Sequence, residues 1–398
     1  MLVERTFDTA AAQPVAHTLR VKVVRSLAAA VPFLAAWEAL AAAALEPNVF
    51  YSPWLLMPAL QYLLQGQGFA LVFVFGGPVE GAAGPALVGF FPLLEPVLPF
   101  APMRLLHHDY CFSTAPLLRA GREREALDTF FDWMQERRMR HPLLRMEGAP
   151  GDGPVAAAMR DCMKERGLRV FESAHFQRPL FRTGEDPESY LQRILPGKRR
   201  SEYRRQGKRL AELGEFRTRV LQAGDDDLEA WLAAFVELEQ RGWKGASNSA
   251  LGSQERTRRF FAESARAAHA RGQLSMFELS LDGRPLAMLC DFLAAPGAYA
   301  FKMGFDEAYA KYSPGVLMEL EFIPLRHQLK ARGVHWIDSC AAPDNQVTSR
   351  LWEDRRTLCS YMVSSGGPLG DLLVRLYPFA KRMKRRVLQM KARLAGDR

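Results

Sequence analysis

The sequence lacks the cysteine spacing of either a disulfide framework or a zinc site. Its five cysteines are scattered over 398 residues and none forms a CxxC pair, so we expect reduced thiols, no metal and a cytoplasmic location. A signal peptide is not expected either, because Glu4 and Asp8 fall where an apolar run should follow a basic start. The longest apolar stretch, residues 26–45, is mostly alanine and contains Pro32 and Glu38. It is expected to form a helix that does not span a membrane.

Acidic residues are nearly absent from two short segments, and the positive charge of the chain is concentrated there. The net charge is +9. Residues 198–209 carry seven cations against Glu202, and residues 381–393 carry seven cations and no acid, so the rest of the chain has a net charge of −4. Such a distribution does not suit a protein that coats nucleic acid, and a nucleic-acid partner is not expected. It predicts two local basic surfaces on a mildly acidic body.

Hydrophobic patterning predicts an α/β (α+β) chain in which a similar order of elements occurs twice. A polar, turn-rich stretch at 182–187 separates the two halves, and the Gly366-Gly367-Pro368 break precedes the tail. The expected domains are therefore 1–183, 184–365 and a basic amphipathic tail at 366–398. Strands are expected at 19–25, 69–75, 86–94, 103–112, 143–147, 168–173, 216–221, 274–281, 285–293, 298–305, 334–339 and 358–363, alternating with helices.

His107, His108 and Asp109 form the densest group of metal-binding residue types in the chain. On the expected strand at 103–112, successive side chains point to opposite faces, so the two histidines cannot easily share an ion. We therefore expect no metal at this place.

The segment after the expected three-stranded meander is suited to binding a phosphate. Ser313 is a good N-cap residue, Pro314 suits the first helical position, and Gly315 allows a ligand to approach the backbone. The first turn of such a helix offers unpaired N–H groups and the positive end of the helix dipole. Lys311 and Tyr312 add a cation and a hydroxyl donor. A well-capped helix without a ligand would have the same sequence.

Four stretches resemble the GNAT superfamily of acyl-CoA N-acyltransferases. They are KRRSEYRRQGKRLAELG, ELEQRGWKG, FDEAYAKYSPG followed by LMELE, and WIDSC followed by LWEDRR. In detail they are similar to the CelD/BcsL-like branch, which is associated with cellulose and exopolysaccharide production and is related to the Fem-type aminoacyltransferases. The first half matches more loosely, through NVFYSPWLLMPAL and LVGFFPLL. The resemblance implies tandem GNAT-like mixed sheets flanked by helices, the first of them degenerate.

The resemblance also implies acetyl-CoA or another acyl-CoA as co-substrate, with its pantetheine along the third meander strand. The sequence departs from the usual Gln/Arg-x-x-Gly-x-Gly/Ala loop, because Pro314 and Val316 stand where that pattern has Gly and Gly/Ala. The cofactor-binding residues implied are Lys311, Tyr312, Ser313, Gly315, Val316 and Leu317.

Acyl transfer to an amine needs a base, a positioned thioester and a stabilised oxyanion. The candidates for the base are Glu239 and Asp338, followed by Asp291, and each has an alternative role as a partner of Arg or Lys. Lys302 lies mid-strand among apolar residues and is expected either to bind an anionic group in a cleft or to reach solvent. Trp243 is a candidate for lining the acceptor pocket, or a packing residue at a helix end.

These observations predict an acyl-CoA-dependent N-acyltransferase, most simply an N-acetyltransferase, acting on a small-molecule or cell-envelope-precursor amine. Two alternatives remain open at this point. One is a Fem-like transferase that uses aminoacyl-tRNA, and the other is a non-catalytic scaffold of a membrane polysaccharide complex. The amphipathic tail suggests peripheral contact with the anionic inner membrane or with an acidic partner.

Overall fold

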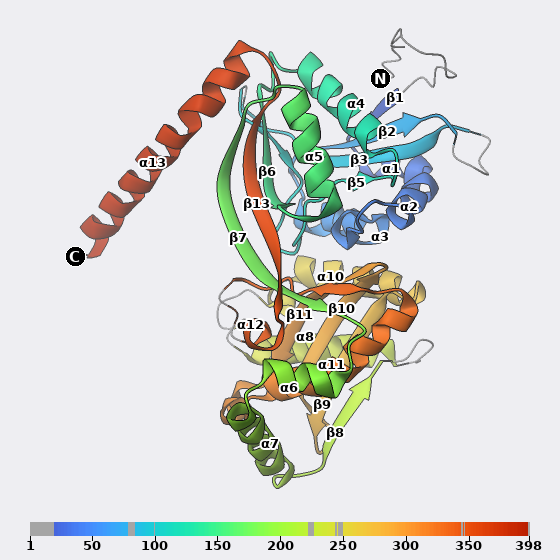
Figure 1. Ribbon diagram of the computed structural model, residues 1–398, viewed down its shortest axis with the longest axis vertical. Coiled ribbons are helices and arrows are strands. Elements are labelled where there is room, and N and C mark those ends of the chain that lie inside the picture. The colour runs from blue at the N-terminus through green and yellow to red at the C-terminus, as the bar shows by residue number, and fades with distance from the viewer. Residues whose placement is uncertain are drawn as a thin grey trace. The chain divides into compact units, whose positions relative to one another are not determined.

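The computed structural model describes residues 20–78, 84–98, 100–221, 227–242, 245, 250–343, 345 and 347–396 (Figure 1). The chain divides into two compact units that are interleaved in sequence. Unit 1 comprises Met1–Tyr51, Gly66–Phe176 and Thr357–Arg398, and unit 2 comprises Ser52–Gln65 and Gln177–Arg356. The sequence suggested consecutive domains meeting at 183/184 and 365/366. The division differs because one early segment packs in unit 2, while the last strand returns to unit 1.

Unit 1 is built on a mixed sheet with strand order β1-β2-β3-β4-β6-β13-β7, in which β1, β2 and β3 are antiparallel and β4 pairs with β6 in parallel. The strands β2 and β3 are almost wholly buried, as their continuous apolar sequences require. The elements are β1 (Arg20–Val24), α1 (Leu27–Ala30), η1 (Val31–Phe33), α2 (Leu34–Ala42), η2 (Val49–Tyr51), β2 (Phe69–Gly76), β3 (Ala86–Leu94), β4 (Met103–Leu105), β5 (Leu117–Leu118), α4 (Glu123–Glu136), β6 (Leu143–Pro150), α5 (Gly153–Glu165), β7 (Val170–Arg182), β13 (Asp354–Ser364) and α13 (Pro368–Gly396).

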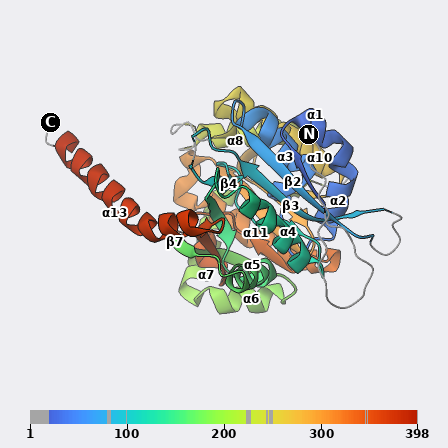
Figure 2. The ribbon, with the colours of Figure 1, turned by 90° about the horizontal axis from the view of Figure 1, so that it is seen from above.

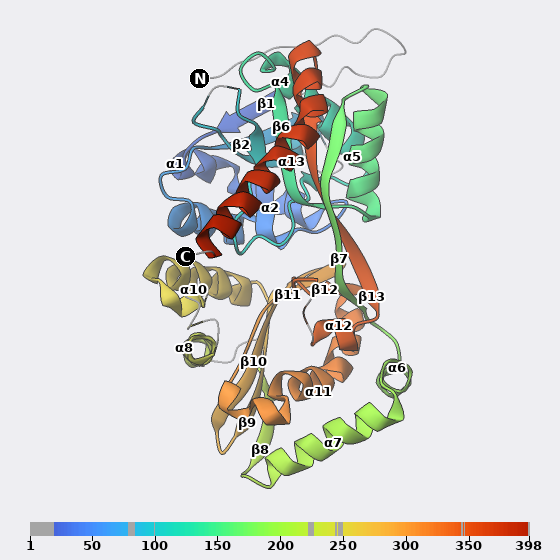
Figure 3. The same ribbon diagram turned by 90° about the vertical axis from the view of Figure 1, so that its left-hand side faces the viewer.

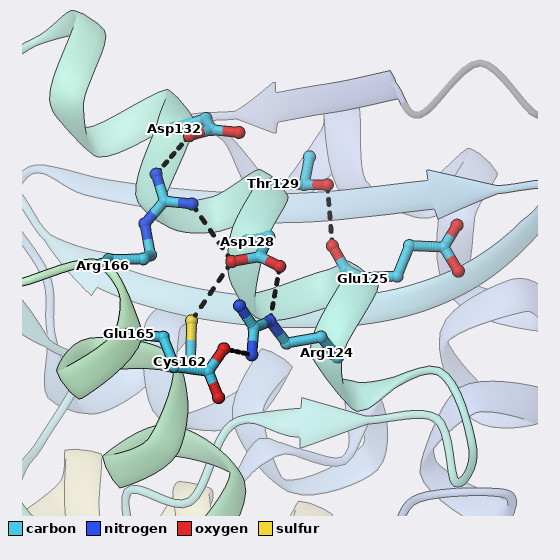
Figure 4. A network of polar contacts seen from close by, with 8 residues as sticks. All are labelled: Arg124, Glu125, Asp128, Thr129, Asp132, Cys162, Glu165 and Arg166. Atoms are coloured by element: carbon cyan, nitrogen blue, oxygen red, sulfur yellow. Dashed lines mark hydrogen bonds and ion pairs between the residues drawn. The ribbon is translucent and has the colours of Figure 1, made fainter. Parts of the chain in front are cut away.

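The helices α4 and α5 of unit 1 are joined by a network of ion pairs centred on Asp128 (Figure 4). Arg124 and Arg166 contact its carboxylate at 2.6 and 3.1 Å. Partial burial raises the pKa of Asp128, but the two guanidinium groups outweigh it and hold the pKa below its usual value. Burial and the same carboxylate raise the pKa of the Cys162 thiol to about 12. This thiol is therefore protonated and serves packing.

Unit 2 has the sheet order β7-β12-β11-β10-β9-β8, in which the meander β8-β9-β10-β11 is antiparallel and β11 pairs with β12 in parallel. Helices α8 and α10 cover one face of the meander, and α11 covers the other (Figure 3). The elements are α3 (Pro53–Pro58), η3 (Ala59–Leu63), α6 (Pro187–Ile194), α7 (Gly197–Ala211), β8 (Phe216–Val220), α8 (Leu228–Arg241), η4 (Leu251–Ser253), α10 (Glu255–Ala270), β9 (Leu274–Leu281), β10 (Arg284–Ala294), β11 (Gly297–Phe305), η5 (Glu307–Tyr312), α11 (Pro314–Gln328), η6 (Leu329–Arg332), β12 (Trp336–Asp338) and α12 (Thr348–Leu351).

The α/β class predicted from the sequence, with mixed sheets flanked by helices, is confirmed. The Asp282-Gly283 hairpin is also confirmed: both residues have positive φ, 50° and 73°, as a type I′ turn requires. The strand expected at 103–112 is wrong beyond Leu105, because the chain turns there. His108 is half-buried in that turn, and burial lowers its pKa to about 3.

Candidate active site

Strands β11 and β12 of unit 2 separate after three paired positions. Pairing runs from Gly297 with Trp336 to Tyr299 with Asp338, and β11 then continues to Phe305. Within the described residues no strand pairs with this part of β11 on that side. The register with β10 shifts between Cys290 and Asp291, so that β11 carries one extra residue there. Such a bulge bends a strand. The result is an open strand edge.

The N-terminus of α11 packs on this open part of β11. A Cβ atom built on Gly315 would lie 3.5 Å from the Met303 sulfur and from the Phe305 ring, which is ordinary contact. The helix start differs from the expected N-cap, because Ser313 adopts a left-handed conformation (φ 53°, ψ 52°) and its side chain makes no capping hydrogen bond. Pro314 occupies the first helical position, as predicted.

Few N–H groups remain available at this helix start. The N–H groups of Val316 and Leu317 donate to the Ser313 carbonyl at 2.9 and 3.0 Å, and Pro314 has none. In the described structure, the N–H of Gly315 is the one in this first turn without an acceptor. The side chains of Val316 and Leu317 are buried in the apolar core, so these two residues offer a ligand only their backbone.

Positive charge surrounds the same helix start. Lys311 is exposed, with its ammonium 4.9 Å from the centre of the Tyr312 ring. The basic helix α7 contacts η5, directly before α11. Arg200 of α7 forms an ion pair with Glu188 at 3.0 Å. Six further cations of α7 are exposed, and none has an ion pair in the described structure: Lys198, Arg199, Arg204, Arg205, Lys208 and Arg209.

Glu239 lies on the other face of the meander. Its carboxylate is fully buried and accepts hydrogen bonds from the Lys302 ammonium at 2.9 Å and from the Leu251 N–H at 2.8 Å. Lys302 belongs to the part of β11 that has separated from β12. Gly304, two residues along the same strand, leaves room for the α8 backbone at Glu239. The structure therefore brings two predicted residues together at the open strand.

Asp338 is held by two arginines at the end of β12. Arg178 approaches its two oxygens at 2.5 and 2.6 Å, and the Nε of Arg356 lies 3.6 Å from Oδ2. The Cys340 N–H donates to the same carboxylate at 3.0 Å. All three charged side chains are buried, and burial lowers the pKa of Arg356 to about 10. Asp338 thus compensates buried positive charge.

Asp291 belongs to a separate buried group on β10 and α11. Its carboxylate lies 2.8 Å from Arg326, which also contacts Glu319 at 3.4 Å. Burial raises the pKa of Asp291 to about 6, against the lowering effect of Arg326. Two carboxylates share one arginine here, and the Trp352 indole N–H donates to Glu319 at 3.3 Å.

A cavity of about 710 Å³ opens between α8 and α10, beside the helical turn that carries Glu239. Val236 and Gln240 line it from α8, and Tyr62 lines it from the early segment that joins unit 2. This contribution was not predicted from the sequence, although the stretch before Tyr62, NVFYSPWLLMPAL, carries the looser resemblance. Trp243, the candidate for an acceptor pocket, lies outside the described residues.

Comparison with known proteins identifies the fold of this region. Residues 197–345, which lie within unit 2, match the family model described as an acetyltransferase (GNAT) domain. No curated protein matches the sequence significantly. Among solved structures, one described as FemX is 12% identical, with a TM-score of 0.53 over 83% of this chain and 95% of its own. It shares the fold.

Two other structures have lower TM-scores. A tandem GNAT protein from the clavulanic acid biosynthesis pathway is 15% identical, with a TM-score of 0.43 over 88% of this chain and 100% of its own. The L-PGS of Bacillus licheniformis is 12% identical, with a TM-score of 0.46 over 80% of this chain and 90% of its own.

Proposed function

We propose that unit 2 is an acyl-CoA-dependent N-acyltransferase, most simply an N-acetyltransferase. The observation that carries this proposal is the open edge of β11, closed at one end by the N-terminus of α11. This arrangement offers strand backbone to an extended chain and a helix dipole to a pyrophosphate. The GNAT domain match over the same residues supports it. The sequence stretches that resemble the CelD/BcsL-like branch suggest an amine acceptor in cell-envelope or exopolysaccharide metabolism.

The residues at the helix start fit a CoA phosphate group. Gly315 offers an N–H without an acceptor and no Cβ in the way, and the exposed cations of α7 and Lys311 supply charge. A helix start with so few free N–H groups must rely more on side-chain cations than one with the usual glycine-rich loop. When bound, acyl-CoA supplies the thioester that activates the acyl group. We place Tyr312 and Ser313 at the edge of this site.

Glu239 is the carboxylate we assign as the base. Asp338 and Asp291 are tied to buried arginines, whereas Glu239 faces Lys302 on the open strand and stands next to the cavity between α8 and α10. We assign this cavity to the acceptor. The amine passes a proton to Glu239 and bonds to the acyl carbon. The C–S bond breaks, and its electron pair leaves with the CoA sulfur as a thiolate. Backbone N–H groups of β11 stabilise the oxyanion, and the Lys302 ammonium, 2.9 Å away, holds the Glu239 carboxylate in place.

Substitution of Gly315 tests the cofactor site. Wild-type protein is expected to melt at a higher temperature with acetyl-CoA or CoA, because a ligand that binds only the folded state stabilises it. Gly315→Trp should abolish this shift by filling the space at the helix start. Gly315→Ala is the matched control, because its Cβ makes only ordinary contacts, and it should retain most of the shift. Thermal melting over a series of acyl-CoA chain lengths measures both.

The result also separates the alternatives. No shift with any acyl-CoA in the wild type would contradict the proposal. The six unpaired cations of α7 would then favour a transferase that uses aminoacyl-tRNA, whose affinity should fall steeply with salt. A protein that binds neither ligand would support the scaffold alternative.

We further propose that α13 lies on an anionic membrane surface. None of the described helices is long and apolar enough to span a membrane. Val374 and Tyr377 of α13 pack on unit 1, and its C-terminal part extends beyond that packing (Figures 1 and 2). Large apolar side chains of α13 stay exposed along one helical stripe: Leu369, Leu372, Leu376, Phe379, Met383, Val387 and Met390.

The charge of α13 favours lipid over a second copy of the helix. Residues 372–396 contain eight cations and no acid. In a paired coiled coil these like charges would flank the seam, with Arg386 falling on it, and would repel. An anionic bilayer accepts the apolar stripe and attracts the cations, each contributing roughly 1 kcal/mol.

Vesicle sedimentation tests this surface. The protein is expected to bind vesicles that contain phosphatidylglycerol and not vesicles of phosphatidylcholine alone, with binding lost at high salt. A Phe379→Ser, Met383→Ser variant should lose at least about tenfold in affinity, since it removes two large apolar side chains that the bilayer would bury. Val31→Ser, an exposed apolar residue of η1, is the control. Equal binding to both vesicle types would contradict the assignment.

A further inference from the structure

Three metal-binding side chains converge on the outer surface of unit 1. Glu172 and His175 come from β7, and Cys359 comes from the neighbouring strand β13. One potential ligand atom of each lies within 4.8 Å of the others. The thiol is buried, while the imidazole and the carboxylate are about half exposed. The cluster is thus open to solvent on one side.

The strand geometry is irregular at this place, in β7 itself and in the pairing of β13 with β6, where the extra residue lies in β6. Exposure alternates along β7 up to Ala174, but His175 is exposed as well, so the alternation changes phase between them. Glu172 and His175, three residues apart, would point to opposite faces of a regular strand. The phase change brings them to one face. In β13 the register with β6 shifts between Cys359 and Tyr361. Bulges of this kind redirect side chains and are frequent beside functional sites.

The contacts converge on one point and do not form a relay. The same ring nitrogen, Nδ1 of His175, lies 3.7 Å from the Cys359 sulfur and 3.4 Å from a Glu172 oxygen. A catalytic Cys-His-Glu triad needs opposite ring nitrogens for its two partners. Ligands that share one cation direct their donor atoms at the same point, as these three side chains do.

The spacing matches a tetrahedral zinc site. Zinc binds sulfur at about 2.3 Å, nitrogen at about 2.0–2.1 Å and carboxylate oxygen at about 2.0–2.2 Å. Tetrahedral geometry then places sulfur and nitrogen ligands about 3.5 Å apart, and nitrogen and oxygen ligands about 3.3 Å apart. The two distances given above are within 0.2 Å of these values. The nearby carboxylate of Asp152 adds to the negative potential at Cys359.

We propose that Glu172, His175 and Cys359 bind a zinc ion, with the fourth position held by water. Thiolate, imidazole and carboxylate together select zinc among the common divalent ions. The ion would join β7 to β13 close to Phe176, where β7 leaves unit 1, and close to Thr357, where β13 enters it. This assignment is independent of the acyltransferase proposal.

Cobalt(II) is the probe, because its thiolate complexes absorb strongly in the near-ultraviolet and tetrahedral cobalt absorbs in the visible. The full-length protein, freed of metal by a chelator and kept reduced with a phosphine, should bind one cobalt ion with both sets of bands, and zinc should displace it. Cys359→Ser should abolish the charge-transfer band. His175→Ala and Glu172→Gln, at exposed positions, should each weaken binding at least about tenfold.

The control variant is Cys162→Ala, a buried thiol of the same unit, which should bind cobalt as the wild type does. A wild-type titration without a charge-transfer band would overturn the site, and so would a band that persists in Cys359→Ser. His175→Ala and Glu172→Gln keep the test valid if the Cys359 variant does not fold.

Discussion

Asp338→Ala is expected to lose about 3–5 kcal/mol of stability, the usual result of removing one partner from a buried ion pair. The substitution leaves Arg178 and Arg356 buried without their carboxylate, and it removes the acceptor of the Cys340 N–H. Urea unfolding of the full chain, followed by circular dichroism, should show a much lower midpoint for the transition that includes unit 2.

The matched control is Asp354→Ala. Asp354 forms an ion pair with Arg182 at 3.3 Å, but both side chains are largely exposed, so its loss should cost less than about 1 kcal/mol. If Asp338→Ala unfolds within about 1 kcal/mol of the wild type, the buried pair does not stabilise the fold as described. Asp338 would then return as a candidate for the catalytic base.

Glu239→Gln is expected to lower the turnover number about 10²–10⁴-fold, the range for a general base. The amide keeps the size of the side chain and can still accept a hydrogen bond from the Leu251 N–H, but it cannot take the proton of an amine. Release of free CoA thiol, measured with acetyl-CoA and a panel of amines, gives the rate. The thermal shift with acetyl-CoA should be unchanged, because Glu239 lies on the face of the meander opposite to α11.

Two measurements distinguish catalysis from positioning. The pH profile of Glu239→Gln should lose the dependence on the base, whereas a residue that only positions others would lower the rate at every pH. Glu321→Gln changes an exposed glutamate of α11 in the same way and should retain full activity. A Glu239→Gln variant with wild-type turnover would remove this residue from the mechanism.

Local patterns in the sequence predicted the elements around the site well. The meander β9-β10-β11, its Asp282-Gly283 turn and the helix that begins at Pro314 all follow from short-range signals. A turn dipeptide or a proline at the first helical position acts through its own backbone geometry. Such features need no knowledge of the rest of the fold.

The partners of the predicted carboxylates could not be found in this way. Arg178 and Arg326 lie 160 and 35 residues from Asp338 and Asp291 in the sequence, and nothing local indicates that these arginines are buried. Only the tertiary structure separates Glu239, beside the open strand, from two carboxylates that compensate arginines. The cluster of Glu172, His175 and Cys359 could not be predicted for the same reason, since its spacing in the sequence matches no linear motif.

The interleaving of the two units restricts how this protein can be made. The sheet of unit 1 contains β13, which leaves the ribosome only after unit 2. The first half of the chain therefore has an incomplete sheet edge while unit 2 is synthesised. An exposed strand edge is prone to wrong pairing. A chaperone that holds the nascent chain should therefore improve its yield. A fragment cut at 183/184 would lack this strand and should aggregate.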